Sequence, residues 1–211
     1  PSAQDAEAIE ADSCPNLQAP LMPLRAVSNC RVLLTGASAG IGAALAEQLA
    51  AQGAKLLITA RRAEPLLDLV ERYPRRVIAL PGDVTDAEHR RRLLARVESE
   101  WGALDLLVNN AGIGAMGAFM AAAPDRIRTI FEVNFFAAAE LCRLAHPWLV
   151  RGTRPAVMNV SSVLGHRAVP YKSEYCASKF ALHGFSDALR AEWSREGIGV
   201  VLVLSLIHIS E

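Results

Sequence analysis

The sequence lacks an excess of charge of either sign, and it lacks any long apolar run. Its 22 Lys and Arg residues balance 22 Asp and Glu residues, so the formal net charge is zero. A nucleic-acid-binding protein usually needs a basic face, which argues against such a partner. No uncharged apolar run approaches the roughly 18 residues that a membrane helix needs, so no membrane span is expected. The hydrophobic content of 52% indicates a folded globular domain.

Cysteine is also scarce. The four cysteines, Cys14, Cys30, Cys142 and Cys176, are scattered, with no CxxC pair and no His/Cys cluster. We therefore expect reduced thiols in a cytoplasmic protein and no metal site. Cys176 adjoins Tyr175, and we interpret it as a small half-buried residue rather than a reactive thiol.

The first 29 residues lack a clear periodicity. They contain Pro15, Pro20 and Pro23, and they do not show the basic-then-apolar order of a signal peptide. We interpret residues 1–29 as a flexible N-terminal tail. The sequence begins with Pro1 rather than methionine, which is compatible with a missing start.

From residue 30 onward, short apolar runs alternate with helical patterns. Strands are expected at 32–34, 55–59, 77–80, 104–108, 156–160 and 200–204, and helices at 41–51, 63–73, 86–101, 124–149 and 173–195. The apolar runs are continuous, which is typical of strands buried on both faces. The alternation predicts an α/β fold over residues 30–205, with a Rossmann-like doubly wound parallel sheet in three layers.

Local signals refine this pattern. The basic run at 89–92 precedes apolar residues at helical spacing, and we interpret it as a solvated helix face rather than a phosphate contact. Gly53 and Gly197 follow helical runs and are expected to adopt the left-handed conformation. Glu64 is expected to cap the helix over 63–73.

The first expected strand runs into a glycine-rich loop. The loop reads TGASAGIG over 35–42. Glycines permit a tight turn and let the backbone approach a pyrophosphate, which then lies at a helix N-terminus. The spacing differs from GxGxxG, and three glycines alone could be a simple strand–helix turn. Placed between a first strand and a first helix, they predict a nucleotide site that includes Gly36, Ser38, Gly40, Ile41 and Gly42.

The end of the second strand bears on the choice of cofactor. It reads Thr59-Ala60-Arg61-Arg62, with no acid to accept a hydrogen bond from a ribose 2′-hydroxyl. An arginine can instead pair bidentately with a 2′-phosphate. NADP(H) is therefore favoured, while NAD(H) stays possible. The alternative for Arg62 is an exposed charge near a helix start.

Two further loops follow the ends of expected strands, where open α/β sheets bind ligands. In the first, Asp83 beside Val84 could accept a hydrogen bond from an adenine amino group, or it could serve as a turn or cap residue. In the second, Asn110, Ala111 and Gly112 follow Asn109. Small residues there let the backbone approach a cofactor, and the asparagine amides can tie neighbouring strands together.

Taken in order, these motifs and those downstream resemble the short-chain dehydrogenase/reductase family. The shared features are TGASAGIG at 35–42, NNAG at 109–112, Asn134 within VNFF, Ser162 within NVSS and YCASK at 175–179. They occur in the order and spacing of the family, with Tyr175 thirteen positions after Ser162. The match covers about residues 31–205, and five ordered motifs are much stronger evidence than any one alone.

The residue types suit acid–base chemistry during hydride transfer. Hydride transfer to a carbonyl builds alkoxide charge that must receive a proton, which Tyr175 can supply although its reference pKa is about 10. Lys179 lies one helical turn later on the same face, where its cation is expected to lower that pKa. Ser162 can donate a hydrogen bond to the substrate oxygen. Taken singly, these residues have ordinary alternatives, a turn serine and a solvated helix face.

The resemblance implies further roles. It implies that Tyr175 and Lys179 contact the cofactor, with Lys179 holding the nicotinamide ribose, and that Asn134 positions a water linking Lys179 to solvent. Without the resemblance, Asn134 is an ordinary polar helix residue. His166 and His183 lie nearby, but no step needs a histidine, so we interpret both as structural or pocket-lining.

The C-terminal end departs from the family pattern. Members usually continue the sixth strand into a Pro-Gly turn, then a segment that covers the nicotinamide and substrate, and then a further helix and strand. Here the end reads LSLIHISE, which resembles translated sequencing-adapter sequence. Our hypothesis is that native sequence ends near Ser205, that 206–211 are a non-native tail, and that the last strand and substrate lid are missing. A native reading frame that runs unbroken to Glu211 would contradict it.

The sequence therefore predicts an NADP(H)-dependent oxidoreductase that interconverts a carbonyl compound and a secondary alcohol, with Tyr175 as general acid/base. The alternatives are a dinucleotide-binding sensor without turnover and an inactive fragment, and the complete catalytic set favours the enzyme. Apolar stretches at 115–120 and 163–166 are expected to line the pocket and favour an apolar small-molecule substrate. The resemblance also implies a homodimer or homotetramer through the helices at 124–150 and 173–195.

Overall fold

The continuous apolar runs form the strands of one parallel sheet. The structure, a computed structural model, describes residues 27–205. The strands are β1 (Arg31–Thr35), β2 (Lys55–Thr59), β3 (Val77–Ala79), β4 (Leu106–Asn109), β5 (Ala156–Ser162) and β6 (Gly199–Ser205). They pair in parallel in the order β3-β2-β1-β4-β5-β6. This order confirms the predicted doubly wound α/β fold.

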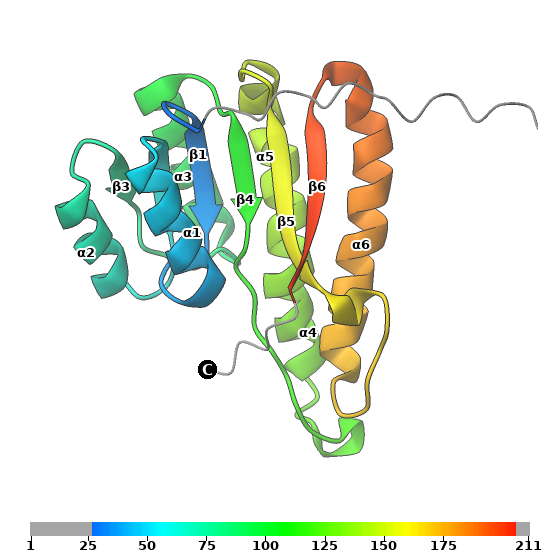
Figure 1. Ribbon diagram of the computed structural model, residues 1–211. Coiled ribbons are helices and arrows are strands. Elements are labelled where there is room, and N and C mark those ends of the chain that lie inside the picture. Colours follow the sequence, from blue (N-terminus) through cyan, green and yellow to red (C-terminus); the bar gives the residue numbers. More distant parts are fainter. Residues whose placement is uncertain (1–26, 206–211) are drawn as a thin grey trace, which may run out of the picture.

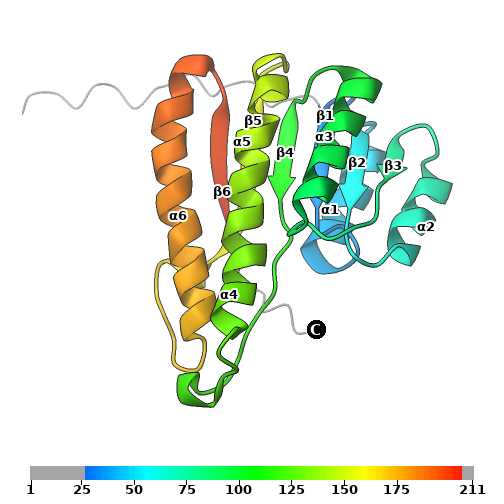
Figure 2. The same cartoon turned by 180° about the vertical axis from the view of Figure 1, so that it is seen from behind.

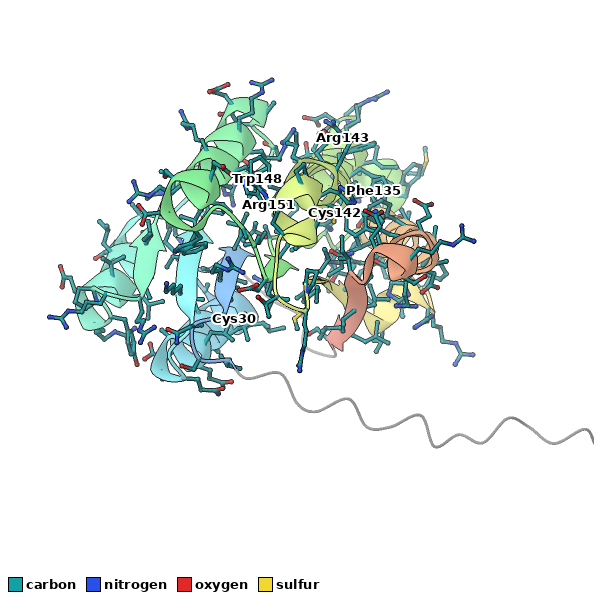
Figure 3. All side chains as sticks on the ribbon, turned by 90° about the horizontal axis from the view of Figure 1, so that it is seen from above. Cys30, Phe135, Cys142, Arg143, Trp148 and Arg151 are labelled. Atoms are coloured by element: carbon teal, nitrogen blue, oxygen red, sulfur yellow. The ribbon has the colours of Figure 1, made fainter. Side chains whose placement is uncertain are left out.

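Helices cover both faces of the sheet. They are α1 (Gly40–Ala51), α2 (Glu64–Arg72), α3 (Ala87–Trp101), α4 (Arg126–Phe131), α5 (Ala137–Val150) and α6 (Ser173–Trp193). Shorter helical segments are η1 (Phe119–Ala121), η2 (Glu132–Phe136), η3 (Val163–Gly165) and η4 (Ser194–Glu196). Helices α1 and α2 lie on one face, and α3, α5 and α6 lie on the other (Figures 1 and 2). Figure 3 shows these layers from the end of the sheet at which β1 begins, near Cys30.

Two apolar clusters explain why the strands are apolar at successive positions. In β1, Val32 and Leu34 pack with α1 and α2, whereas Leu33 packs with α3, α5 and α6. All three residues are 0% exposed. Because successive side chains of a strand point to opposite faces, a sheet covered on both sides needs apolar residues throughout.

The edge strand β6 departs from this rule. Val200 is buried in the cluster on the side of α6, but Val201 is 46% and Leu204 41% exposed. The continuous apolar run predicted burial on both faces, and for β6 that prediction is wrong. No helix of the described residues lies in front of β6 in Figure 1, so its second face has no cover within the described chain.

The ends of the domain differ slightly from the prediction. Residues 27–29, assigned to the tail, form a turn in which the Asn29 N–H donates to the Gly53 carbonyl over 2.8 Å. The rest of the predicted tail, residues 1–26, and the predicted non-native end, 206–211, lie outside the described residues. Gly53 and Gly197 have φ angles of 86° and 72°, which confirms the predicted left-handed conformation.

Two local predictions are wrong. Glu64 is the first residue of α2, and no side-chain hydrogen bond caps that helix. His89 does not belong to a solvated face, because it is 0% exposed and its Nε2 lies 2.8 Å from the hydroxyl of Thr59. Helical spacing places His89 on the same face as Leu93, which packs against the sheet. The solvated face is confirmed for Arg91, which is exposed.

The expected single helix over 124–149 is interrupted. It is divided into α4, the π-helix η2 and α5. A π-turn inserts one extra residue per hydrogen-bonded ring and therefore rotates the side chains that follow. Asn134 lies within η2 and is 1% exposed, so this irregularity sets where its side chain points.

Candidate active site

The glycine loop is packed too tightly for side chains at two of its positions. A Cβ at Gly36 would lie 2.8 Å from the Ala111 Cα, and one at Gly42 would lie 2.1 Å from the Gly36 carbonyl oxygen. Gly36 and Gly40 also have positive φ angles, of 69° and 54°. The loop therefore brings bare backbone to the end of β4, as a nucleotide cradle requires.

The N-terminus of α1 is free to bind an anion. Its N-cap residue, Ala39, makes no side-chain capping bond, and the first turn contains no acidic residue. The first N–H groups of a helix lack partners within it, and together with the helix dipole they attract negative charge. This terminus, next to the glycine loop, fits the pyrophosphate of a dinucleotide.

A hydrogen-bonded clamp joins the glycine loop to the end of β4. The Asn110 amide donates to the carbonyls of Thr35 and Gly36, each over 3.0 Å. The Thr35 hydroxyl accepts from the N–H groups of Asn110 and Ala111, also over 3.0 Å. The clamp confirms that asparagine amides tie strands together here, and it lies where β1 and β4 separate and the sheet order reverses.

Most of the residues predicted to bind the adenosine end of the cofactor lie on exposed turns. Arg61 and Arg62 are exposed, and Arg62 donates to the Ser38 carbonyl over 3.2 Å. The Asp83 carboxylate accepts from the N–H and the hydroxyl of Thr85, each over 2.8 Å. Asp83 is thus held as a turn residue, with one oxygen engaged, while Val84 beside it is buried.

Asn134 is fixed by three hydrogen bonds. Its Oδ1 accepts from the Ile113 N–H over 2.8 Å, and its Nδ2 donates to the Ile113 carbonyl and to the Ser178 hydroxyl, each over 3.0 Å. Ser178 lies between Tyr175 and Lys179 on α6. Asn134 therefore joins the loop after β4 to the helix that carries the two expected catalytic residues.

Tyr175, Ser162 and Lys179 come together between β5 and α6. Ser162, at the end of β5, lies close enough to the Tyr175 side chain to lower the pKa of its phenol, and its hydroxyl accepts from the Leu164 N–H over 3.2 Å. The Lys179 ammonium lies 5.7 Å from the centre of the Tyr175 ring and donates to the Val160 carbonyl over 3.1 Å. Gly112 is nearby, since a Cβ there would lie 3.7 Å from the lysine nitrogen.

Burial dominates the electrostatics of this group. Burial raises the pKa of the Tyr175 phenol, and the hydrogen bond with Ser162 partly opposes that rise. Burial also lowers the pKa of Lys179 to about 8. The expected lowering of the Tyr175 pKa by Lys179 is therefore not found, because desolvation is the largest cause of the pKa shift at both groups.

A cavity connects the nucleotide loops with these residues. Its lining includes Ile41, Asn110, Gly112, Ile113, Tyr175 and Lys179. The stretches at 115–120 and 163–166 were expected to line the pocket, but none of their residues does so in the described chain. Met116, Phe119 and Met120 instead lie on the surface, 72%, 60% and 91% exposed.

The histidines and Cys176 take no part in the cavity. His183 is buried, and its ring centre lies 4.3 Å from that of His166, which agrees with a structural role. Cys176 is 2% exposed, so it is fully rather than half buried. Within residues 27–205 there is no group of three or more potential ligands that could hold a metal ion, and no helix suited to crossing a membrane.

Comparison with known proteins places this arrangement in a family. A model of the short chain dehydrogenases matches residues 31–206. The 3-ketodihydrosphingosine reductase of Bacteroides thetaiotaomicron is 34% identical, over 82% of this chain and 61% of its own length. A ketoacyl reductase of Nostoc is also 34% identical, over 82% of this chain and 61% of the relative. The chain belongs to the short-chain dehydrogenase family.

Solved structures agree with this assignment. A short-chain dehydrogenase from Streptomyces avermitilis has a TM-score of 0.78 and 40% identity, covering 83% of this chain and 65% of that one. A family member from Burkholderia phymatum in complex with NAD has a TM-score of 0.80 and 26% identity, covering 85% and 66%. The chain thus spans less than two thirds of the length of these two curated relatives and about two thirds of the two solved ones.

Several residues that shape this dehydrogenase site were missed by sequence reasoning. Thr35 opens the glycine motif, but its hydroxyl bonds to Asn110 and Ala111 depend on the approach of β4. Ser178 is 0% exposed and bonds to Asn134. It lies inside the YCASK motif, so its only sequence signal was its position between Tyr175 and Lys179.

The buried ammonium of Lys179 predicts an unusual pH dependence of stability. The pKa is about 8 in the folded chain against 10.5 for an ordinary lysine. Between these values the unfolded chain binds more protons, so the contribution of Lys179 to stability rises with pH and is unfavourable below about pH 8. We expect Lys179→Met to be more stable than the wild type at pH 7, by on the order of 3 kcal/mol, in urea unfolding.

The difference in stability should shrink as the pH is raised from about 8 towards 10.5. Lys55→Met is the control, because Lys55 is exposed at the start of β2 and removal of its charge should have little effect. A stability difference for Lys179→Met that stays constant over this pH range would contradict the desolvation argument.

Proposed function

We propose that this protein is an NADP(H)-dependent oxidoreductase that interconverts a carbonyl compound and a secondary alcohol, with Tyr175 as general acid/base. The observation that carries the proposal is a cavity lined by Tyr175 and Lys179 together with Ile41 of the glycine loop, with Ser162 next to Tyr175 at the end of β5. Two relatives are named as reductases of a keto compound, which supports a carbonyl substrate.

The residues present fit a dinucleotide. Backbone at Gly36, Gly40 and Gly42 approaches without side chains, and the uncapped α1 N-terminus can receive the pyrophosphate. Ile41 and Gly112 line the cavity beyond it. When bound, the nicotinamide supplies or accepts the hydride. The chain's own residues hold that ring, exclude water and move one proton.

The position of Tyr175 indicates how the proton is transferred to and from the substrate. For reduction, its hydroxyl donates a proton to the substrate oxygen as alkoxide charge develops, and Ser162 donates a hydrogen bond to the same oxygen. The raised pKa keeps the phenol protonated at neutral pH, which suits an acid. For oxidation, Tyr175 accepts the hydroxyl proton, and a cofactor cation would have to favour its ionised form.

Lys179 and Asn134 support that transfer. Lys179 holds the nicotinamide ribose, and its lowered pKa of about 8 lets it exchange a proton near neutral pH. Asn134 holds Ile113 at the cavity wall and positions a water that links Lys179 to solvent. A dinucleotide sensor without turnover is the second candidate, and it needs none of these proton-transfer groups.

Arg61 and Arg62 favour NADP(H) over NAD(H). Both follow the end of β2, and Arg62 already contacts the glycine loop through the Ser38 carbonyl. No acidic residue stands between Thr59 and Arg62 to repel a 2′-phosphate or to hold a 2′-hydroxyl. The second carboxylate oxygen of Asp83 then accepts a hydrogen bond from the adenine amino group.

The class of substrate, the assembly and the location are proposed from exposed apolar residues and from the cysteines. Met116, Phe119 and Met120 are exposed apolar residues in the segment that follows Gly114 of the cavity lining, which supports an apolar substrate. Phe136 and Phe180 are 47% and 45% exposed on η2 and α6, and they support a homodimer or homotetramer through these helices. Cys142 and Cys176 are buried and form no disulfide within the described residues, which supports a cytoplasmic location.

Tyr175→Phe tests the catalytic proposal. The full-length protein should oxidise NADPH in the presence of at least one member of a ketone panel. Loss of the phenolic proton should lower kcat at least about 100-fold, while NADPH binding, followed by fluorescence, should stay the same. Tyr171→Phe is the matched control, since Tyr171 is 65% exposed. Turnover that survives in Tyr175→Phe would overturn the role of Tyr175.

Arg61→Asp tests the choice of cofactor. Replacing a cation with an anion beside the expected 2′-phosphate should weaken NADPH binding relative to NADH binding by about tenfold or more. Fluorescence titration with both cofactors measures that ratio directly. Arg75→Asp, on the exposed turn before β3, is the control. An unchanged ratio in Arg61→Asp would reject the 2′-phosphate role.

A further inference from the structure

An ion pair with a buried carboxylate and a half-buried guanidinium lies directly before Tyr175, and no step of the proposed reaction uses it. The Glu174 side chain is 2% exposed, and its Oε1 accepts from Nε and Nη2 of Arg126 over 2.9 and 2.6 Å. Its Oε2 accepts from the Ser173 hydroxyl over 2.8 Å. Both carboxylate oxygens are therefore engaged, one by α4 and one by the first turn of α6.

The pair differs from the exposed ion pairs on the helix surfaces. Arg91 and Glu88, for example, are 65% and 60% exposed, and such solvated pairs contribute little. Removing a carboxylate from water costs several kcal/mol, and apolar residues of similar volume are often as stable. Stability alone therefore gives little reason for an acid at position 174, whereas the definition of a particular geometry does.

The pair also contacts the loop that continues from the wall of the cavity. The loop from Ile113 to Gly117 follows β4, and its first residue is held by Asn134. At its other end, the Gly117 N–H donates to the Tyr171 carbonyl over 2.9 Å. A Cβ at Gly117, whose φ is +137°, would lie 3.4 Å from Nη1 of Arg126. The guanidinium thus lies against this loop while it binds Glu174.

Three parts of the site consequently meet at one guanidinium. Arg126 belongs to α4, Glu174 to the first turn of α6, and Gly117 to the loop that continues from the cavity lining. The carboxylate is also placed at a helix N-terminus, where the dipole favours negative charge. A rigid pair at this point fixes how the first turn of α6 is oriented relative to the cavity.

We infer that Arg126 and Glu174 are positioning residues that hold Tyr175 in register with the cavity loop. The inference rests on the proposed role of Tyr175 as general acid/base. The phenol must lie within hydrogen-bond reach of the substrate oxygen, and a displacement of about 1 Å can cost up to 100-fold in rate. Tyr175 follows Glu174 directly, so a shift of that first turn moves the phenol with it.

The test compares Glu174→Ala with Glu174→Gln in full-length protein. Reduction of 9,10-phenanthrenequinone, an apolar diketone, by NADPH serves as the probe reaction. We expect Glu174→Ala to lower kcat about tenfold and to leave the Kd for NADPH within about twofold. Glu174→Gln keeps an oxygen in the place of Oε1 and should recover kcat to within about threefold of wild type.

The control is Glu88→Ala, which removes an exposed partner of Arg91 and should leave kcat unchanged. A folded Glu174→Ala with wild-type kcat would overturn the inference, as would equal losses in Glu174→Ala and Glu174→Gln. If Glu174→Ala does not fold, Arg126→Lys keeps the charge but loses the two-pronged donor. Arg126→Lys should then show the tenfold loss, and an unchanged kcat would count against the pair.

A second readout separates this inference from the proposed function. The chain has 3 tyrosines, so the ¹³Cζ resonance of labelled Tyr175 can be assigned with Tyr175→Phe. We expect that resonance to shift in Glu174→Ala and to return in Glu174→Gln. If the wild type reduces no ketone, the proposed function fails while the resonance still reports on positioning. If turnover is present but the resonance does not move in Glu174→Ala, only the positioning role fails.

Discussion

The site depends on the close approach of the β1–α1 loop to the end of β4. Asn110 donates two hydrogen bonds to Thr35 across this junction, and Gly36 leaves no room for even one methyl group against Ala111. The junction lies where the sheet order reverses, so the helices that follow β1 and β4 diverge to opposite faces. We propose that the cofactor binds in the space between them, and the other candidate site residues are placed relative to it.

A second chain of polar contacts carries this geometry across to α6. The Asn109 amide donates to Asn159 of β5 over 2.9 Å, and Asn159 donates to Ser186 of α6 over 2.9 Å. Asn134 and Ser178 make a parallel connection nearer the cavity. Hydrogen bonds between buried side chains restrict how the elements that carry them can be arranged. They align Tyr175 and Lys179, on one face of α6, with the loops that follow β1 and β4.

The sequence was sufficient to predict the fold class and the proximity of Tyr175 and Lys179 because those signals are local. Spacing along one helix places Tyr175 and Lys179 on the same face, and glycines at fixed positions identify the nucleotide loop. Features that depend on contacts between distant segments were missed. The π-turn at Asn134 leaves no periodic signal, and the burial of His89 against Thr59 depends on how α3 meets the sheet. The pKa of Tyr175 was misjudged because desolvation can be assessed only once the fold is known.

The central claim is that this cleft transfers hydride between a nicotinamide and a carbonyl carbon. The most direct measurement uses NADPH deuterated at C4 of the nicotinamide, full-length protein and a ketone, with mass spectrometry of the alcohol product. The account predicts one deuterium on the carbinol carbon from one of the two C4 epimers of the cofactor, and none from the other. Binding of NADPH without deuterated alcohol from either epimer, across a broad ketone panel, would contradict the account and favour a dinucleotide sensor.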